Sequence, residues 1–460
     1  ADESILIGEP PPRESYLDIE KIITAAKESG CDAIHPGYGF LAENPLLPTR
    51  CEEEKITFIG PSAAAINLLG NKVESRIKMA DAHIPLIPGM KSSSADMKVF
   101  SKAAEKAGYP VIIKAAAGGG GKGMRVVASA EELSDAVEAA QREAKNAFDD
   151  DTVYLEKYIA NPRHIEFQIM ADSHGKCVHV FERECSIQRR HQKIIEESPS
   201  VALTDALRKK MGADAVKVAQ AAGYVNAGTV EFLLDKSGNY YFLEMNTRIQ
   251  VEHPITEMVT GTDLVVEQIR IAAGLSLSEQ FDNLTQRGHA IECRIYAEDG
   301  ENNFMPSTGR IVFYSEPIGP GVRVDSGVAL GSEVTIDYDP ILAKLIVHAP
   351  DRDLAIKKMI ATLSDYKILG LKTSRKFMID CLSNAAFASG ETFTSFIEEH
   401  MANRDLDLDK YRDLAVAAAS VAASKKSGPI GLGQSTTAEL LTPWQIIGDW
   451  QIGDSIHEQT

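Results

Sequence analysis

The stretch that decides the fold is residues 231–254, EFLLDKSGNYYFLEMNTRIQVEHP. Apolar and aromatic residues flank a Lys-Ser-Gly-Asn turn, and this pattern predicts a β-hairpin. A turn centred between Ser237 and Gly238 places Glu231 opposite Glu244. Two carboxylates that oppose each other about 5 Å apart destabilise a strand pair unless a cation lies between them. The hairpin therefore predicts a cation site.

Polar and apolar residues alternate along the second half of this stretch. In an extended chain, a period of two places alternate side chains on one face. Mg²⁺ typically takes one or two carboxylates together with substrate phosphates, and an arginine among acids suits an anion. We predict a metal–phosphate site continuous with an anion site, and a solvated edge strand is the alternative. The face comprises Glu244, Asn246, Arg248, Gln250 and Glu252.

Composition narrows the class of protein. With 460 residues the chain has room for two or three domains, and a net charge of −18 argues against binding nucleic-acid backbones. The six cysteines show no CxxC spacing, which favours a reducing compartment. The longest apolar run, residues 414–423, is too short to span a membrane, and no signal-peptide pattern opens the chain. We expect a cytoplasmic protein, or a mitochondrial matrix protein if the source is eukaryotic.

The order of the patterns suggests five regions and an α/β and α+β fold. Residues 1–60 alternate helical and strand patterns, which predicts a parallel sheet that begins partway through a βα unit. Residues 61–86 are linking helices. Residues 87–158 form a compact α+β unit, small enough to move as a lid, and residues 159–400 hold several strands with helices between them. The predicted strands of this region are Ile165–Met170, Cys177–Glu182, Thr229–Leu234, Tyr240–Glu244, His289–Tyr296 and Gly309–Tyr314. Residues 401–460 contain a helix, a linker and, at Trp444–Ile452, the start of a following module.

A run of glycines, residues 118–121, lies between two strand-like segments. It formally contains GxGxxG, but a strand pattern follows where a dinucleotide-binding motif needs a helix. The P-loop pattern also fails, because Ala116 stands at its first glycine and Gly123 at its Ser/Thr position. We predict a hairpin loop whose backbone N–H groups approach phosphate oxygens, with Lys114 just ahead of it. A flexible hairpin tip is the alternative.

Several segments together resemble the ATP-grasp fold, specifically the biotin carboxylase component of an acyl-CoA carboxylase α subunit. The resemblance implies an ATP-grasp fold preceded by a parallel-sheet N-terminal domain and followed by a C-terminal β-rich domain. It also implies that the N-terminal domain is truncated, because relatives begin with a further strand and helix. The segments are His35–Asn44, Phe58–Pro61, the Lys114 loop, Glu156–Tyr158, Pro162–Gln168, Gln188–Lys193, Glu244–His253 and Glu292–Ile295.

The resemblance implies a role for each matching residue. Glu252 would deprotonate bicarbonate, and Arg294 would stabilise the enolate-like oxygen of biotin; Lys193 and Arg248 complete the catalytic set. Glu231, Glu244 and Asn246 would ligate Mg²⁺ or Mn²⁺. Bicarbonate would contact Lys193, Arg248, Gln250 and the Val251 backbone. ATP would contact Lys72, Lys114, Gly120, Gly121, Glu156, Lys157, Ile159, His164, Gln188 and His191.

The implied reaction is the first half-reaction of an acyl-CoA carboxylase. Bicarbonate attacks the γ-phosphoryl group of ATP to give carboxyphosphate, and the CO₂ released adds to biotin. No Ala-Met-Lys-Met acceptor motif occurs in the chain, so biotin would be carried on another domain or chain. The implied partners are a biotin carboxyl carrier, a carboxyltransferase, and further copies of the chain in a homodimer or larger assembly, without nucleic acid or membrane.

Two other functions stay open on the sequence. One is an ATP-grasp ligase that activates a different carboxylate, and the other is a catalytically impaired nucleotide-binding subunit. The Thr442-Pro-Trp444 segment resembles the segment that comes after this domain in acyl-CoA carboxylases and favours propionyl- or methylcrotonyl-type systems over pyruvate carboxylase. The choice of final acceptor belongs to the carboxyltransferase.

Overall fold

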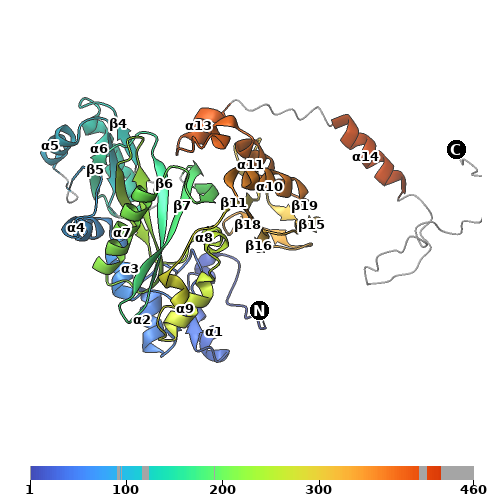
Figure 1. The fold of residues 1–460 in the computed structure, drawn as a ribbon, viewed down its shortest axis with the longest axis horizontal. Helices are drawn as coiled ribbons and strands as arrows, with labels where there is room; N and C mark the ends of the chain where they lie inside the picture. The colour runs from blue at the N-terminus through green and yellow to red at the C-terminus, as the bar shows by residue number, and fades with distance from the viewer. Residues whose placement is uncertain are drawn as a thin grey trace, which may run out of the picture. The chain divides into compact units, whose positions relative to one another are not determined.

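The computed structural model describes residues 2–90, 94, 96–116, 124–190, 192–402 and 412–425 (Figure 1). The chain divides into two compact units, Ala1–Arg404 and Asp405–Thr460. In the second unit the described part is one helix, α14 (Arg412–Lys425). The predictions for Gly120, Gly121, His191 and Trp444–Ile452 concern residues outside the described ranges.

The N-terminal segment contains the expected parallel pair. Strands β1 (Ala33–Ile34) and β2 (Thr57–Phe58) pair in parallel. A small core that includes Ile23, Leu47 and Cys51 packs behind them. The helices of this segment and of the linking region that follows are η1 (Pro12–Glu14), α1 (Ile19–Glu28), α2 (Leu46–Glu53), α3 (Ala63–Gly70) and α4 (Lys72–Asp81).

The unit predicted as a lid has its own sheet and its own core. Its strands lie in the order β4-β3-β5, and the buried side chains of Phe100, Ile113 and Leu155 belong to a cluster confined to residues 90–155. A separate core allows such a unit to move as one body. Its elements are α5 (Met97–Ala107), β3 (Val111–Ala115), β4 (Arg125–Val127), α6 (Leu133–Phe148) and β5 (Val153–Lys157).

An eight-stranded antiparallel sheet, in the order β10-β9-β6-β7-β8-β11-β18-β16, forms the centre of the first unit. Three of its strands, β8, β16 and β18, were missing from the sequence prediction. β18 is an almost continuous apolar run buried on both faces, and such a run lacks the alternation that marks a strand. The strands are β6 (Arg163–Ala171), β7 (Cys177–Arg189), β8 (Gln192–Ser198), β9 (Asn226–Leu234), β10 (Tyr240–Asn246), β11 (His289–Tyr296), β16 (Val322–Ser326) and β18 (Ile341–Ala349).

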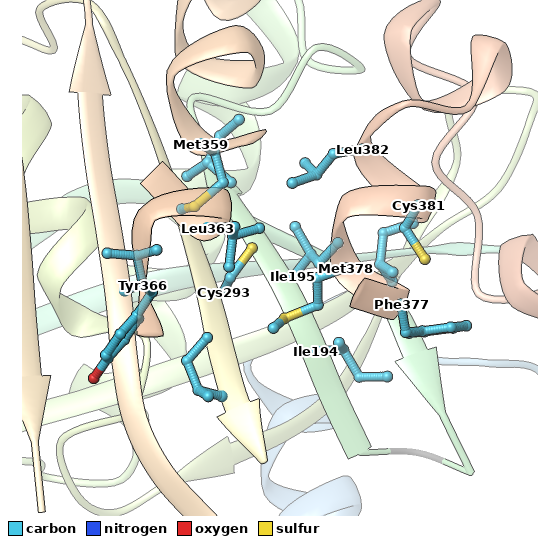
Figure 2. Close-up of a cluster of buried hydrophobic side chains, with 14 of the residues drawn as sticks. Ile194, Ile195, Cys293, Met359, Leu363, Tyr366, Phe377, Met378, Cys381 and Leu382 are labelled. Carbon is cyan, nitrogen blue, oxygen red and sulfur yellow. The ribbon is translucent and has the colours of Figure 1, made fainter. Parts of the chain in front are cut away.

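Helices cover both halves of this sheet. Met359 and Leu363 of α10 and Met378 of α11 pack over Cys293 of β11 and Ile195 of β8 (Figure 2). At the other end, α7 packs on β6 and β7. The helices are α7 (Asp205–Ala221), α8 (His253–Thr260), α9 (Leu264–Ala272), η2 (Glu279–Asp282), α10 (Arg352–Asp365), α11 (Arg375–Leu382), α12 (Ala385–Ala388) and α13 (Phe396–His400).

Three short strand pairs complete the C-terminal part of this unit. The pairs are β12 (Glu298–Asp299) with β13 (Met305–Pro306), β14 (Gly309–Arg310) with β17 (Glu333–Val334), and β15 (Phe313–Ser315) with β19 (Lys367–Leu369).

Among the helices of the described ranges, none has both the length and the apolar composition that a membrane span needs.

Candidate active site

The predicted pairing of Glu231 on β9 with Glu244 on β10 is confirmed. The predicted turn centre was wrong, because Asp235 N donates to Asn239 O at 2.8 Å and the turn is therefore centred on Ser237. A β-bulge just before Glu244 then shifts the register by one residue. The two displacements cancel, so the carboxylates face each other as expected.

The prediction of an extended chain from residue 244 to residue 252 is wrong beyond its first part. β10 ends at Asn246, and the chain then turns before α8 begins at His253. His253 N donates to Gln250 O at 3.3 Å, which closes the last turn before the helix. Arg248, Gln250 and Glu252 therefore reach the site from turns and not from an extended strand.

Glu231 is the most densely bonded carboxylate of the site. Its Oε1 accepts from Lys193 Nζ at 3.0 Å, Asn246 Nδ2 at 2.9 Å and Gln250 Nε2 at 3.1 Å. Its Oε2 lies 3.1 Å from His164 Nε2. Burial opposes ionisation, but Lys193 and His164 outweigh it and hold the pKa of Glu231 well below its usual value. The structure thus joins four of the residues that the sequence predicted separately to this carboxylate.

Glu244 has the opposite environment. Partial burial and the charge of Glu231 raise the pKa of Glu244, whose side chain is 40% exposed, and Lys72 Nζ lies 3.8 Å from its Oε2. A carboxylate pair in which one member is destabilised fits a divalent cation placed between the two groups. Asn246, whose side-chain amide contacts Glu231, would add a neutral oxygen ligand. The chemistry of this donor set therefore fits Mg²⁺, and its role as the metal site stays a prediction.

Lys193 connects the two ends of the site. From β8 its Nζ donates to Glu166 Oε2 at 2.6 Å, to Glu231 Oε1 at 3.0 Å and to Glu252 Oε1 at 2.7 Å. Burial opposes the charged form, but the three carboxylates raise the pKa of Lys193 well above its usual value. The ammonium is therefore a permanent charge at the centre of the site.

Glu166 and Arg183 are buried site residues to which the sequence prediction gave no role. Arg183, fully buried on β7, donates from Nε to Glu166 Oε1 at 2.5 Å. Glu166 lies two residues after His164 on β6, so the strand period already places both side chains on one face. That period was the signal that could have identified Glu166. No comparable signal marks Arg183, because its partners come from β6, β9 and α8.

Arg248 lies between the predicted metal residues and the N-terminal segment. Its Nη1 donates to Gln250 Oε1 at 2.8 Å, and its Nη2 to Asn246 Oδ1 at 3.3 Å. Its Nε lies 3.3 Å from Glu43 Oε2, and Glu43 Oε1 accepts from Thr247 N at 3.2 Å. Glu43 belongs to the His35–Asn44 segment and was not predicted as a site residue. It fixes the position of the loop that carries Arg248.

Glu252 lies at the far end of the site and is fully buried. Its Oε1 accepts from Lys193, and its Oε2 accepts from Arg294 Nη2 at 2.9 Å. Burial and Glu166 oppose ionisation, but Lys193 and Arg294 outweigh them and lower the pKa of Glu252. Val251, just before it, is held by Lys344, whose Nζ donates to the Val251 carbonyl at 2.9 Å. Glu252 is therefore ionised at neutral pH, the state that a general base requires.

A second group of predicted residues lies at the edge of the lid unit. The buried Glu156 accepts from Lys114 Nζ at 2.7 Å and pairs with Arg76. Lys157 N donates to Pro88 O at 2.7 Å, so this main-chain donor is already engaged. The half-buried Ile159 lies two residues after the end of β5. These residues line the boundary between the lid strand and the segment that follows α4.

His164 and Gln188 contact each other on adjacent strands. Gln188 Nε2 lies 3.1 Å from His164 Nδ1 and donates to Cys185 O at 2.7 Å. Burial favours the neutral imidazole, but the Glu231 carboxylate outweighs it and raises the pKa of His164 to about 9. The other imidazole nitrogen, Nε2, lies 3.1 Å from the Glu231 carboxylate.

Three family models match the chain in succession. The biotin carboxylase N-terminal domain matches residues 1–66. The ATP-binding domain of the carbamoyl-phosphate synthase L chain matches residues 71–280, and the biotin carboxylase C-terminal domain matches residues 292–399. The matched ranges contain all the site residues described above.

Individual proteins show the same similarity. The chain is 52% identical over 410 residues to a subunit of pyruvate carboxylase from Methanothermobacter thermautotrophicus, and the match covers 89% of the chain and 83% of that relative. It is 46% identical over 462 residues to the alpha subunit of mitochondrial methylcrotonoyl-CoA carboxylase from Dictyostelium discoideum, and this match covers 100% of the chain but 65% of that relative.

Among solved structures, one similar protein is the biotin carboxylase domain dimer of Hydrogenobacter thermophilus 2-oxoglutarate carboxylase, in complex with MgADP, ADP and bicarbonate. The TM-score is 0.82 at 46% sequence identity, and the match covers 86% of this chain and 87% of that one.

Proposed function

The chain belongs to the biotin carboxylase family, and from that premise we propose that it performs the first half-reaction of an acyl-CoA carboxylase, the ATP-dependent carboxylation by bicarbonate of biotin carried on another domain or chain. The observation that carries the proposal is the position of Lys193. Its ammonium bridges the metal carboxylate Glu231 and the buried base Glu252. One permanent cation thus connects a phosphate-handling end with a proton-accepting end.

At the phosphate-handling end, Glu231, Glu244 and Asn246 would hold the divalent cation. When bound, this cation neutralises charge on the phosphoryl oxygens of ATP. Lys72, at the first residue of α4, and Lys114 on β3 supply point charges for the phosphates. We assign the remaining nucleotide contacts to Glu156, Lys157, Ile159, His164, Gln188, His191, Gly120 and Gly121.

At the other end, bicarbonate would bind among Lys193, Arg248, Gln250 and the Val251 main chain. An arginine suits a planar oxyanion because its N–H groups form a fork. The ionised Glu252 would accept the bicarbonate proton at its carboxylate, between Lys193 and Arg294. Arg294 would neutralise negative charge at the ureido oxygen of biotin. Closure of the lid would exclude water from the unstable carboxyphosphate.

The acyl-CoA assignment rests on the match to the methylcrotonoyl-CoA carboxylase relative, which extends over the whole chain. The higher identity to the pyruvate carboxylase relative favours pyruvate as a second candidate acceptor.

We propose a carrier protein or domain and a carboxyltransferase as partners, and a homodimer or larger assembly. The free thiols of all six cysteines support a reducing compartment, the cytoplasm or, in a eukaryote, the mitochondrial matrix.

The test is the rate of ADP formation from MgATP with bicarbonate and free biotin. Glu252→Gln is expected to lower the bicarbonate-dependent rate about 100-fold or more, the usual contribution of a general base, and Arg248→Ala is expected to lower it as well. Glu267→Gln is the matched control, because this buried acid bonds Ser278 on the α9 side of the molecule. Equal rates in the wild type, Glu252→Gln and Arg248→Ala would indicate a non-catalytic nucleotide-binding subunit. Stimulation by another carboxylic acid instead of bicarbonate would indicate a different ligase.

A further inference from the structure

Two fully buried carboxyl groups face each other behind the catalytic end of the site. Glu196 on β8 is directly opposite Glu292 on the neighbouring strand β11, and both side chains are 0% exposed. Two ionised carboxylates at opposed positions of a strand pair would repel each other strongly in a buried environment. The strand register therefore favours a pair that carries less than its full charge.

The hydrogen bonding of the pair points the same way. Among the described residues, Glu196 Oε2 and both carboxyl oxygens of Glu292 have no hydrogen-bond partner. A proton held by one carboxyl group and donated to the other would satisfy Glu196 Oε2 and one of the two Glu292 oxygens. Burial raises the pKa of Glu196 to about 7 and that of Glu292 well above its usual value. One shared proton accounts for the reduced charge of the pair and satisfies two of its three unpartnered oxygens.

This pair is connected to Arg294, which lies two residues after Glu292 on the same face of β11. Arg294 Nε donates to Glu196 Oε1 at 2.6 Å, and its Nη2 donates to Glu252 Oε2 at 2.9 Å. A planar guanidinium that donates hydrogen bonds from two different nitrogens has a fixed orientation. Glu196 accepts one of these two hydrogen bonds, and Glu252 accepts the other.

We propose that Glu196 is a positioning residue for the biotin-dependent stage of the reaction. Glu196 accepts the hydrogen bond from Arg294 Nε and so holds the guanidinium in its working orientation, and Glu196 shares a proton with Glu292. The proposal rests on the function proposed above, because it presupposes that Arg294 acts on biotin. It adds two residues, Glu196 and Glu292, to which the proposed function assigns no contact with nucleotide or bicarbonate. Their effect reaches the substrate through Arg294.

Among the titratable groups at this end of the site, the Glu196–Glu292 pair is the one expected to ionise near neutral pH. The charges that face it are Arg294, Glu252, Lys193 on β8 and Lys344 on β18. The other titratable neighbours are shifted away from neutrality by burial, which raises the pKa of Tyr296 to about 12, lowers that of His253 to about 3 and raises those of Cys185 and Cys293.

The experiment compares two rates on each protein preparation: ADP formation from MgATP and bicarbonate without biotin, and the increment caused by free biotin. Their ratio does not depend on the folded fraction. Glu196→Met removes the acceptor for Arg294 Nε and is expected to lower the ratio about tenfold or more, as for a lost charge-assisted hydrogen bond. Glu196→Gln keeps an acceptor oxygen, so its ratio is expected to stay within about threefold of the wild type.

The pH profile adds a readout that a purely structural role would not move. The biotin-dependent increment of the wild type is expected to show an ionisation near pH 7, which Glu196→Gln removes. Glu197→Gln is the matched control, because this buried acid is the next residue on β8 but bonds His289 and Arg352. Its stability is expected to fall with the ratio unchanged.

Two outcomes would overturn the proposal: an unchanged ratio in Glu196→Met, which includes a loss of both rates by the same factor, or a pH profile of Glu196→Gln identical to that of the wild type. If Glu196→Met does not fold, the Glu196→Gln profile still decides. A wild-type protein that shows no bicarbonate-dependent ADP formation would instead contradict the proposed function, so the two failures are distinguishable.

Discussion

Glu231 and Glu244 face each other across one strand pair, yet substitution of the two is expected to have opposite effects on stability. Glu231 accepts from three donors, so Glu231→Gln in the metal-free protein would leave Lys193 with less charge compensation and lower the melting temperature. Burial and Glu231 raise the pKa of Glu244. A carboxyl group with a raised pKa destabilises the folded state above its unfolded pKa, so Glu244→Gln is expected to raise the melting temperature at pH 7.

Thermal unfolding in the presence of a chelator measures both effects. Glu398→Gln, an exposed acid on α13, serves as the control and is expected to leave stability within about 0.5 kcal/mol of the wild type. A lower melting temperature for Glu244→Gln would contradict the assignment of Glu244 as the destabilised member of the pair.

Arg183 shows how much of the site depends on a residue that touches no substrate. Its guanidinium is fully buried and donates to Glu166, Gln168, Thr256 and Thr229. Removal of one partner from a buried ion pair usually costs about 3–5 kcal/mol. We expect Arg183→Met to lower the free energy of unfolding by about this amount, measured by urea denaturation. A loss below about 1 kcal/mol would show that Glu166 is held by Lys193 alone.

Among the elements, β8, β11 and α10 are tied together by Glu197. Its carboxylate accepts from His289 Nε2 at 2.8 Å and from Arg352 Nε at 2.7 Å. Burial opposes ionisation, but the bonds from His289 and Arg352 lower the pKa of Glu197 to about 2. A carboxylate with a lowered folded pKa stabilises the protein above its unfolded pKa, and this contribution is lost as the pH falls.

Glu197→Gln is therefore expected to destabilise the protein at pH 7 by an amount of order 3 kcal/mol. The difference from the wild type should shrink as the pH falls from about 4.5 toward about 2, where the wild-type carboxylate also becomes protonated. Urea denaturation at pH 7, 5, 4 and 3 measures this trend. A difference that does not depend on pH would mean that packing rather than charge connects these elements.

The elements that carry alternation or strong turn signals could be predicted from the sequence. The predicted β9–β10 hairpin and the pairing of its two glutamates are confirmed. The predicted turn centre was wrong, and no residue pattern in the sequence indicates the bulge before Glu244. β18 is buried on both faces, so its pattern does not separate it from a helix. Arg183 and Glu196 could not be placed, because their partners are fixed by strand register across the sheet, and register is a tertiary property.

At the scale of the whole molecule, every described site residue lies in the unit Ala1–Arg404. A chain that ends at Arg404 is therefore expected to keep the bicarbonate-dependent rate of ADP formation within about twofold of the full chain, because no core of the first unit is removed. The lid unit belongs to this part and has a core of its own. A rate that falls about tenfold or more in the shortened chain would place an essential group beyond Arg404.

The central claim is that Glu231 and Glu244 together hold the divalent cation of a nucleotide complex. Calorimetric titration of the protein with a non-hydrolysable ATP analogue, with and without Mg²⁺, tests it most directly when the wild type is compared with the double variant Glu231→Gln/Glu244→Gln. We predict that Mg²⁺ tightens nucleotide binding to the wild type and that this effect disappears in the double variant. An equal Mg²⁺ effect in both proteins would contradict the claim.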